Sequence, residues 1–304
     1  MVLRLAITAA ILAYLFSTSI DLGQAARATA AIRLPHLLVV LVMVGIDRAV
    51  MILRWILLLR ASGNPISTGD ATRLFLVSSF VGSFLPAGVG ADAARAYGLA
   101  RENTAGSEAL ASVAVDRLLG ILSLVLMALV GVAAWAPQGQ TGTVIAAVIV
   151  PAMLACMAVF FANEWMRWFI PAGRHDGFII RRVLRLTDAV GRYRDRRRVL
   201  GHVLAWSLAV QVLRITQAYI LGLGLGMTVP FTYFLLFMPL ALLLLLLPIS
   251  ISGFGLPQGG IVWMLQPMGV PESQAFALST LIVLTGLAGN LPGLYLWLRK
   301  SSRI

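Results

Sequence analysis

The sequence predicts an all-α membrane protein that crosses the bilayer several times. Of its 304 residues, 60% are hydrophobic and only 12% are charged, and the charged residues cluster between long apolar runs. An apolar run of about 20 residues is long enough for a helix to cross the hydrocarbon core of a bilayer. Two runs are broken by Pro and Gly beside charged residues, which is typical of discontinuous helices that line a cavity. We therefore expect a single transmembrane domain with about six full spans and two broken re-entrant hairpins, or about six to eight transmembrane helices.

The composition excludes several other classes of protein. The formal net charge of +12 comes almost entirely from arginine, since Lys300 is the only lysine. These basic residues flank apolar runs, so we expect them to contact anionic lipid headgroups and to set the topology rather than to bind nucleic acid. The single cysteine, Cys156, cannot form an intrachain disulfide, and the three histidines are scattered. We therefore expect no metal site and no cofactor.

The first half of the chain, residues 1–162, carries four of the expected full spans, at 1–20, 36–59, 108–135 and 142–162. Residues 1–20 have the length of a signal peptide, but no clear small-residue cleavage site follows, so we favour an uncleaved span. Within 36–59, Asp47 and Arg54 are seven residues apart and share a helical face. We expect either a structural pair, with Arg54 reaching toward the membrane interface, or a place along a substrate path.

The first broken segment covers residues 74–86 and 88–100. Each part would be about 20 Å long at the usual helical rise, which is short of the roughly 30 Å hydrocarbon thickness. The break at Pro86, Gly88 and Gly90 therefore favours a re-entrant hairpin that enters and leaves on one side. Two tilted full spans are the alternative.

Residues 163–200 form a basic loop that contains ten arginines. Its apolar residues recur with roughly helical period, which predicts an amphipathic helix on the membrane surface. By the positive-inside rule this loop lies in the cytoplasm, and counting spans outward from it puts both termini there as well.

The second half of the chain, residues 201–304, repeats the pattern of the first. A span at 201–224 carries Gln211, Arg214 and Gln217 on one broad polar face. Apolar segments at 231–247 and 256–265 flank a second break, and the last span covers 273–298; the break is marked by Pro248, Gly253 and Gly255. In the expected topology the two hairpins enter from opposite sides, which is the inverted repeat of many secondary transporters.

Charged residues beside the first break are the candidate site. Asp92 and Arg95 are three apart and share one helical face, whereas Asp116 and Arg117 are adjacent and cannot face each other. Phosphate is the anion that best suits convergent guanidinium groups, here Arg95, Arg117 and Arg214. Asp92 and Asp116 are expected to orient these arginines or to meet a cationic headgroup, and a purely structural network is the alternative.

Gln211 is a further candidate for substrate binding, and Gln258 and Asn290 are weaker ones. Gln211 belongs to the polar face of the span at 201–224, and Gln258 follows the second break. Polar contact between helices is the alternative role for Gln258, and the same holds for Asn290 in the last span.

The run FLPAGVGADAARAYGLA at residues 84–100, followed by EALASVAVDRLLGILSL at 108–124, resembles the membrane family named for the transmembrane region of lysylphosphatidylglycerol synthase. That family has a Leu-Pro break, a Gly-Gly-Asp-x-x-Arg stretch and an acidic-Arg pair in the next span. Ala91 stands where a second Gly is usual, and Asp116 where Glu is common. The matching positions are Pro86, Gly90, Asp92, Arg95, Asp116 and Arg117, and Pro248, Gly253, Gly255 and Gly259 resemble the second Gly-rich break.

The resemblance implies lipid translocation in the bacterial cytoplasmic (inner) membrane. In the bifunctional synthases this region acts as a flippase for the aminoacylated lipid, and a separate soluble domain makes that lipid. We see no such domain in this sequence, so we expect a transporter rather than a synthase. Stand-alone relatives are linked to glycolipid, polyprenyl-phosphate or hopanoid pathways, which leaves the lipid open. A membrane-embedded transferase acting on a lipid phosphate and a non-catalytic partner subunit of a lipid-modifying system are the alternatives.

Overall fold

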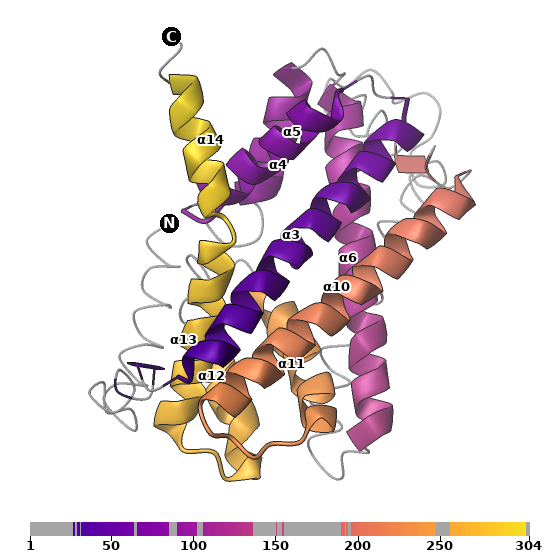
Figure 1. Cartoon of the computed structure of the whole chain (residues 1–304). Coiled ribbons are helices and arrows are strands. Elements are labelled where there is room, and N and C mark those ends of the chain that lie inside the picture. Colours follow the sequence, from indigo (N-terminus) through magenta and orange to yellow (C-terminus); the bar gives the residue numbers. More distant parts are fainter. Residues whose placement is uncertain are drawn as a thin grey trace.

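The computed structural model describes residues 32–63, 66–84, 90–101, 106–135, 196–246 and 256–301, with a few isolated residues between these ranges. In these ranges the regular structure is helical, and no strand occurs (Figure 1). The helices are α3 (Leu34–Ala61), α4 (Thr68–Gly82), α5 (Gly90–Arg101), α6 (Gly106–Trp135), α10 (Arg197–Gly224), α11 (Phe231–Leu246), α12 (Leu256–Leu265), α13 (Glu272–Ala288) and α14 (Leu291–Ser301), with a short 3-10 turn η1 (Gln266–Met268).

Four stretches of helix are long and apolar enough to cross a membrane. They are α3, α6, α10 and the combined α13 and α14, and each contains about as many residues as a bilayer span requires. These four match the spans expected at 36–59, 108–135, 201–224 and 273–298. The all-α polytopic fold is therefore confirmed. The spans expected at 1–20 and 142–162, and most of the basic loop, lie outside the described residues.

The helices α3 and α10 run antiparallel and pack along much of their length. The backbone N–H of Arg33, just before α3, donates to the carbonyl oxygen of Gly224 at the end of α10. Toward the other end of the molecule, Arg54 of α3 reaches Ser207 of α10. Contacts at both ends fix how the two helices align, and hence which of their polar residues face each other.

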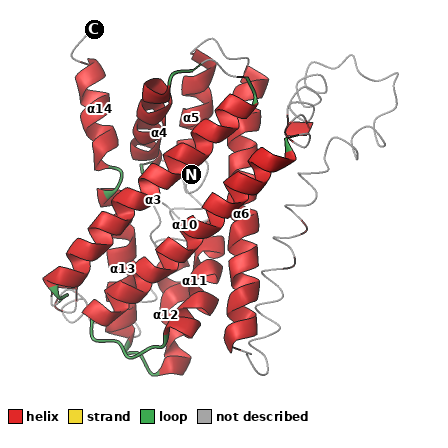
Figure 2. Cartoon of the chain, turned by 45° about the vertical axis from the view of Figure 1, so that its right-hand side comes forward, coloured by secondary structure: helices red, strands yellow, loops and turns green. Residues whose placement is uncertain are grey.

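Two pairs of short helices lie at opposite ends of the molecule. The pair α4 and α5 lies at the end where α3 stops and α6 begins, whereas α11 and α12 lie at the end where α10 stops (Figure 1). The second view shows the same arrangement (Figure 2). This arrangement is the one that two re-entrant hairpins entering from opposite sides would have. Gly90 begins α5, and the other predicted break residues, Pro86, Gly88, Pro248, Gly253 and Gly255, lie outside the described residues.

Close packing holds α4 against α5 near the break. At Gly82, the last residue of α4, an added Cβ would overlap the backbone of Ala91 in α5. A residue with a side chain would therefore push the two helices apart. This contact brings the first turn of α5, which carries Asp92, close to the end of α4.

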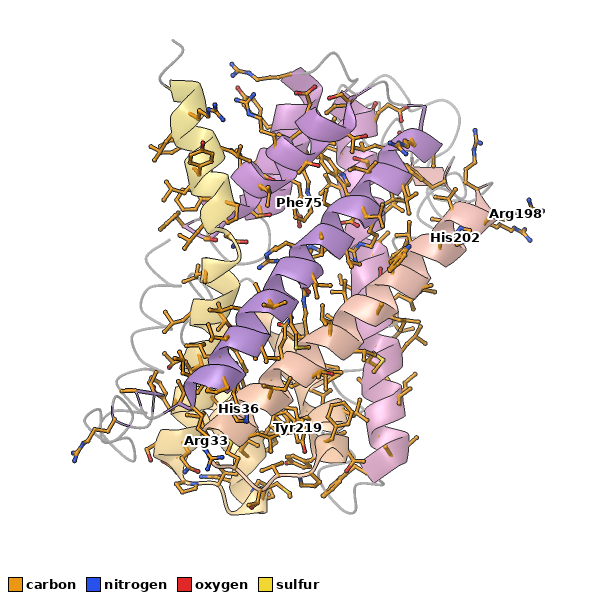
Figure 3. All side chains as sticks on the ribbon, viewed as in Figure 1. Arg33, His36, Phe75, Arg198, His202 and Tyr219 are labelled. Carbon is orange, nitrogen blue, oxygen red and sulfur yellow. The ribbon has the colours of Figure 1, made fainter. Side chains whose placement is uncertain are left out.

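Apolar side chains cover the outer surface of the spans, and charged side chains gather at their ends. Leu34, Leu38 and Val42 of α3 are each more than half exposed, as expected for a surface that meets lipid tails. Arg33 and Arg198 extend outward near opposite ends of the molecule (Figure 3). Among the described residues, the buried charged side chains Asp47, Arg54, Arg95 and Asp116 lie in or beside the same region of the bundle.

Candidate functional site: an arginine-lined cavity

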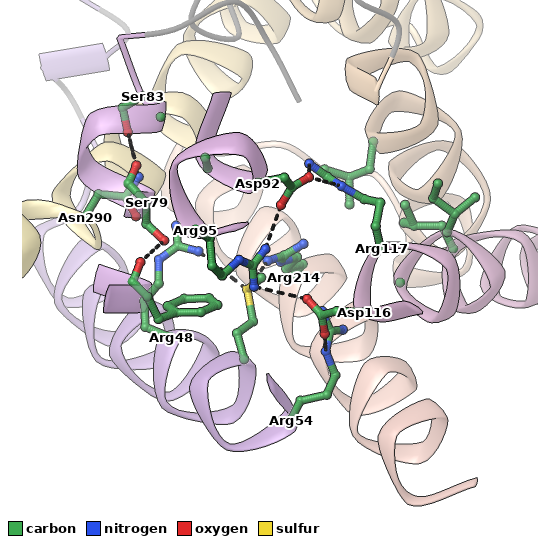
Figure 4. A pocket seen from close by; sticks show the side chains of 18 of the residues that line it. Arg48, Arg54, Ser79, Ser83, Asp92, Arg95, Asp116, Arg117, Arg214 and Asn290 are labelled. Carbon is green, nitrogen blue, oxygen red and sulfur yellow. Dashed lines mark hydrogen bonds and ion pairs between the residues drawn. The ribbon is translucent and has the colours of Figure 1, made fainter. Parts of the chain in front are cut away.

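A cavity of about 310 Å³ lies between the first hairpin, the long spans and the start of α14 (Figure 4). Its size lies at the lower end of the range for small-molecule sites. The polar side chains that line it are Arg48, Arg54, Ser79, Ser83, Asp92, Arg95, Asp116, Arg117, Gln211, Arg214 and Asn290. They come from five helices, α3, α4, α5, α6 and α10, with Ser83 directly after α4 and Asn290 in the turn between α13 and α14, so the cavity depends on the assembled fold.

Asp116 lies at the buried centre of the network. Its Oδ1 accepts a hydrogen bond of 2.7 Å from Arg54 Nε, and its Oδ2 accepts one of 3.2 Å from Arg95 Nη1. Arg54 also donates from Nη1 to Ser207 Oγ at 2.9 Å. One carboxylate of α6 thus holds arginines from α3 and α5. Of the two alternatives for Arg54, the one in which it reaches toward the membrane interface is wrong, because its side chain is only 5% exposed.

Asp92 joins the first hairpin to α6. Arg95 Nη2 donates to Asp92 Oδ1 at 2.6 Å, and Arg117 Nε donates to Asp92 Oδ2 at 2.7 Å. Asp116 and Arg117, adjacent in sequence, thus find their partners on other helices, because neighbouring residues of a helix do not face each other. The guanidinium of Arg95 also lies 4.9 Å from the ring centroid of Phe75, where a cation–π contact is favourable.

Asp47 organises a second group of arginines on the α3–α10 side. Its Oδ1 accepts from Arg214 Nε at 2.8 Å, and its Oδ2 accepts from Arg214 Nη2 and Arg48 Nη1, each at 3.3 Å. Arg48 Nη2 further donates to the carbonyl oxygen of Gly286 at 3.1 Å. Its Nε is buried and has no hydrogen-bond partner among the described residues.

The cavity carries an excess of positive charge. Five arginines line it, and three aspartates pair with them, so the group has a net charge of +2. In surroundings of low dielectric constant such an excess is costly unless an anion compensates it. The guanidinium groups, unlike ammonium groups, offer paired donors that suit the oxygens of a phosphate. The geometry therefore suits an anionic group, with phosphate as the best match.

The structure brings six of the seven predicted site residues to this cavity: Asp92, Arg95, Asp116, Arg117, Gln211 and Arg214. The seventh, Gln258, is fully buried in α12 and is not among the lining residues. Asn290, which we expected to join helices, donates from Nδ2 to Ser83 Oγ at 2.8 Å and also lines the cavity.

Arg48 and Arg54 line the cavity but were not among the predicted site residues. The available signal was the presence of three charged residues, at 47, 48 and 54, inside one membrane-length apolar run. In the part of the chain that the structure describes, no group of three or more His, Cys, Asp or Glu side chains could hold a metal ion.

These features define the class of protein: a multi-pass α-helical membrane protein with an arginine-lined cavity enclosed by its helices. The chain belongs to the family described as the lysylphosphatidylglycerol synthase TM region, whose model matches residues 1–293. The match confirms the resemblance seen at residues 84–100 and 108–124 and extends it over nearly the whole chain. No curated protein matches the chain.

Proposed function

We propose that this protein is a lipid transporter of the flippase type in the bacterial inner membrane, with both termini in the cytoplasm. The headgroup of a phosphate-bearing lipid would pass through the arginine-lined cavity while its tails stay in the bilayer. Phospholipids, phosphorylated glycolipids, polyprenyl phosphates and hopanoid-type lipids all fall within this class. The observation that carries the proposal is the net charge of +2 of the five lining arginines and their three aspartate partners, at a cavity between the first hairpin and membrane-length helices.

The contacts within the cavity support binding of a lipid phosphate. Arg48 Nε is a buried donor without a partner among the described residues, and Arg48 lines the cavity. A phosphate oxygen at this nitrogen would satisfy it and reduce the excess positive charge. Arginines of both charged groups, around Asp47 and around Asp116, line this cavity, so one anion in it would lie near both groups.

The aspartates favour transport over a transferase reaction. A transferase of this kind would need one of them as a nucleophile or general base. Every carboxylate oxygen of Asp47, Asp92 and Asp116 accepts a hydrogen bond from an arginine. These side chains are therefore suited to positioning the arginines. The sequence also contains no ATP-binding loop, so transport would be passive or coupled to an ion.

The experiment that tests the proposal measures lipid movement in sealed liposomes. Purified protein is reconstituted with acyl-labelled fluorescent phosphatidylglycerol, and a membrane-impermeant reductant reports the fraction that reaches the outer leaflet. Arg48→Gln and Arg214→Gln should each slow protein-dependent movement by about tenfold or more, because each removes charge-assisted hydrogen bonds to phosphate. The matched control is Arg60→Gln, since Arg60 is exposed at the end of α3 and does not line the cavity.

Two results would contradict the proposal. Equal rates in wild type and both cavity variants would remove these arginines from the transport path. A wild-type rate equal to that of protein-free liposomes, for every phospholipid tested and for polyprenyl phosphate, would contradict the proposed flippase function. If the protein is instead a non-catalytic partner subunit, an Asp92→Asn, Arg95→Gln double variant should still bind its partner protein.

A further inference from the structure

Two side-chain amides in the cavity wall are held in one orientation by serines. Gln211 of α10 is only 2% exposed, and its Nε2 donates to Ser123 Oγ of α6 at 3.1 Å. Ser123 donates its own hydroxyl proton to the carbonyl oxygen of Gly120 at 2.7 Å. A hydroxyl has one proton, so Ser123 can only accept from Gln211. The NH₂ group of Gln211 must therefore face the serine, and its Oε1 must face away.

Asn290, between α13 and α14, shows the same arrangement. Its Nδ2 donates to Ser83 Oγ at 2.8 Å, and Ser83 Oγ donates to the carbonyl oxygen of Ser79 at 3.0 Å (Figure 4). The proton of Ser83 is thus used within α4, which fixes Asn290 with its Oδ1 directed away from the serine. Each amide joins the second half of the chain to the first.

The amide oxygens differ from the other acceptors of the cavity. Gln211 Oε1 and Asn290 Oδ1 are buried and have no hydrogen-bond partner among the described residues. The carboxylate oxygens of Asp92 and Asp116, in contrast, are all bonded to arginines. A buried acceptor without a partner is costly, so these two oxygens are suited to a donor that arrives with a ligand.

We propose that Gln211 and Asn290 determine headgroup specificity by accepting hydrogen bonds from hydroxyl or ammonium groups attached to the phosphate. The inference rests on the proposed function, since the arginines would hold the phosphate itself. It adds that the cavity discriminates among lipids of equal charge: a headgroup with donors is accepted, and one without donors leaves both amide oxygens unsatisfied. A site built on hydrogen bonds rejects such an analogue more strongly than an apolar site would.

The test compares two lipids that differ only in these donors. Phosphatidylglycerol and phosphatidylpropanol carry the same phosphodiester charge and a three-carbon headgroup, but only the first has hydroxyl groups. Wild type should move acyl-labelled phosphatidylglycerol about tenfold faster. Gln211→Met and Asn290→Leu should each slow phosphatidylglycerol relative to phosphatidylpropanol, so that the ratio of the two rates falls toward one.

Two further variants separate this effect from a general loss of structure. Ser123→Ala removes only the group that orients Gln211, and it should lower the ratio while the rate for phosphatidylpropanol stays at the wild-type level. Gln217→Met is the matched control, because Gln217 lies on the same helix but does not line the cavity. It should keep the wild-type ratio.

Binding of short-chain forms of both lipids to the detergent-solubilised protein is measured in parallel. Movement of both lipids at equal rates by the wild-type protein would contradict the proposed headgroup specificity but agree with the proposed flippase function. A different outcome is that wild type binds phosphatidylglycerol more tightly than phosphatidylpropanol, that this difference is lost in Gln211→Met, and that neither lipid is moved. That result would contradict the proposed flippase function and support the proposed headgroup specificity. A ratio unchanged in both Gln211→Met and Asn290→Leu would also overturn the specificity.

Discussion

Arg54 and Asp116 form a buried ion pair between two membrane-length helices, 62 residues apart in sequence. Nε of Arg54 lies 2.7 Å from Oδ1 of Asp116, and the two side chains are 5% and 3% exposed. Asp116 also holds Arg95 of the first hairpin. One carboxylate therefore fixes α3, α5 and α6 relative to one another at the cavity wall.

Replacing this carboxylate should destabilise the whole protein. Asp116→Asn leaves Arg54 with an uncompensated charge in the interior and removes one of the two carboxylates that Arg95 contacts, at a cost of about 3–5 kcal/mol. We expect a clear drop in the thermal unfolding midpoint of the purified protein in detergent. Asp70→Asn is the control, because Asp70 is an exposed acid in the first turn of α4, and its midpoint should stay near that of wild type. Equal midpoints for the two variants would contradict the buried role of Asp116.

The contact between α6 and α11 should depend on a glycine. At Gly131 of α6, an added Cβ would overlap the backbone of Leu235 and Leu236 in α11. Because backbone atoms have little room to move, Gly131→Ala should cost about 1–3 kcal/mol. Gly45→Ala in α3 is the matched control, since nothing lies within 4 Å of an added Cβ there. Helix propensity should make that variant equal to wild type or slightly more stable, and the same thermal measurement compares the two. A Gly131→Ala protein with the wild-type midpoint would contradict the close packing.

The sequence was sufficient to predict the class of fold and four of its spans. The length and apolarity of a run determine whether it can span a bilayer, and both can be read locally. The charged residues beside the first break were equally visible, because Asp92, Arg95, Asp116 and Arg117 are conspicuous in apolar surroundings. The family pattern points to the same residues.

The partners of these residues could not be predicted, because they depend on how distant helices pack. Helical periodicity gives the face of a side chain within its own helix and nothing about the helix it meets. Asp47 pairs with Arg214 across 167 residues, and Asn290 meets Ser83 across 207. The same limit explains Gln258. Its position after the second break suggested that it lines the site, but it is buried in α12 and does not line the cavity.

The net charge of the cavity should select anionic over zwitterionic lipids. Arg214→Gln lowers that charge from +2 to +1 and leaves Asp47 with Arg48 as its partner. Movement of phosphatidylglycerol should therefore fall more than movement of phosphatidylcholine, whose phosphate charge is balanced within the headgroup. Both labelled lipids are followed in matched liposome preparations, with Arg60→Gln as control. An equal proportional loss for the two lipids would show that Arg214 does not act through charge.

The opposite placement of the two hairpins predicts which loops each side of the membrane can reach. Ser62, after α3, lies at the end that carries α4 and α5, and Thr228 lies at the end that carries α11 and α12; both are exposed. Ser62→Cys and Thr228→Cys are made separately in a Cys156→Ser background, which removes the only native cysteine. A membrane-impermeant maleimide should label Thr228→Cys in intact cells and Ser62→Cys only in inside-out vesicles. More arginines flank the first site, where Arg60, Arg73 and Arg101 lie, than the second, where Arg33 lies. Labelling of both from the same side would contradict the inverted hairpins. Labelling of Ser62→Cys in intact cells and of Thr228→Cys only in inside-out vesicles would still agree with inverted hairpins. It would show that the arginines do not set the orientation of the protein.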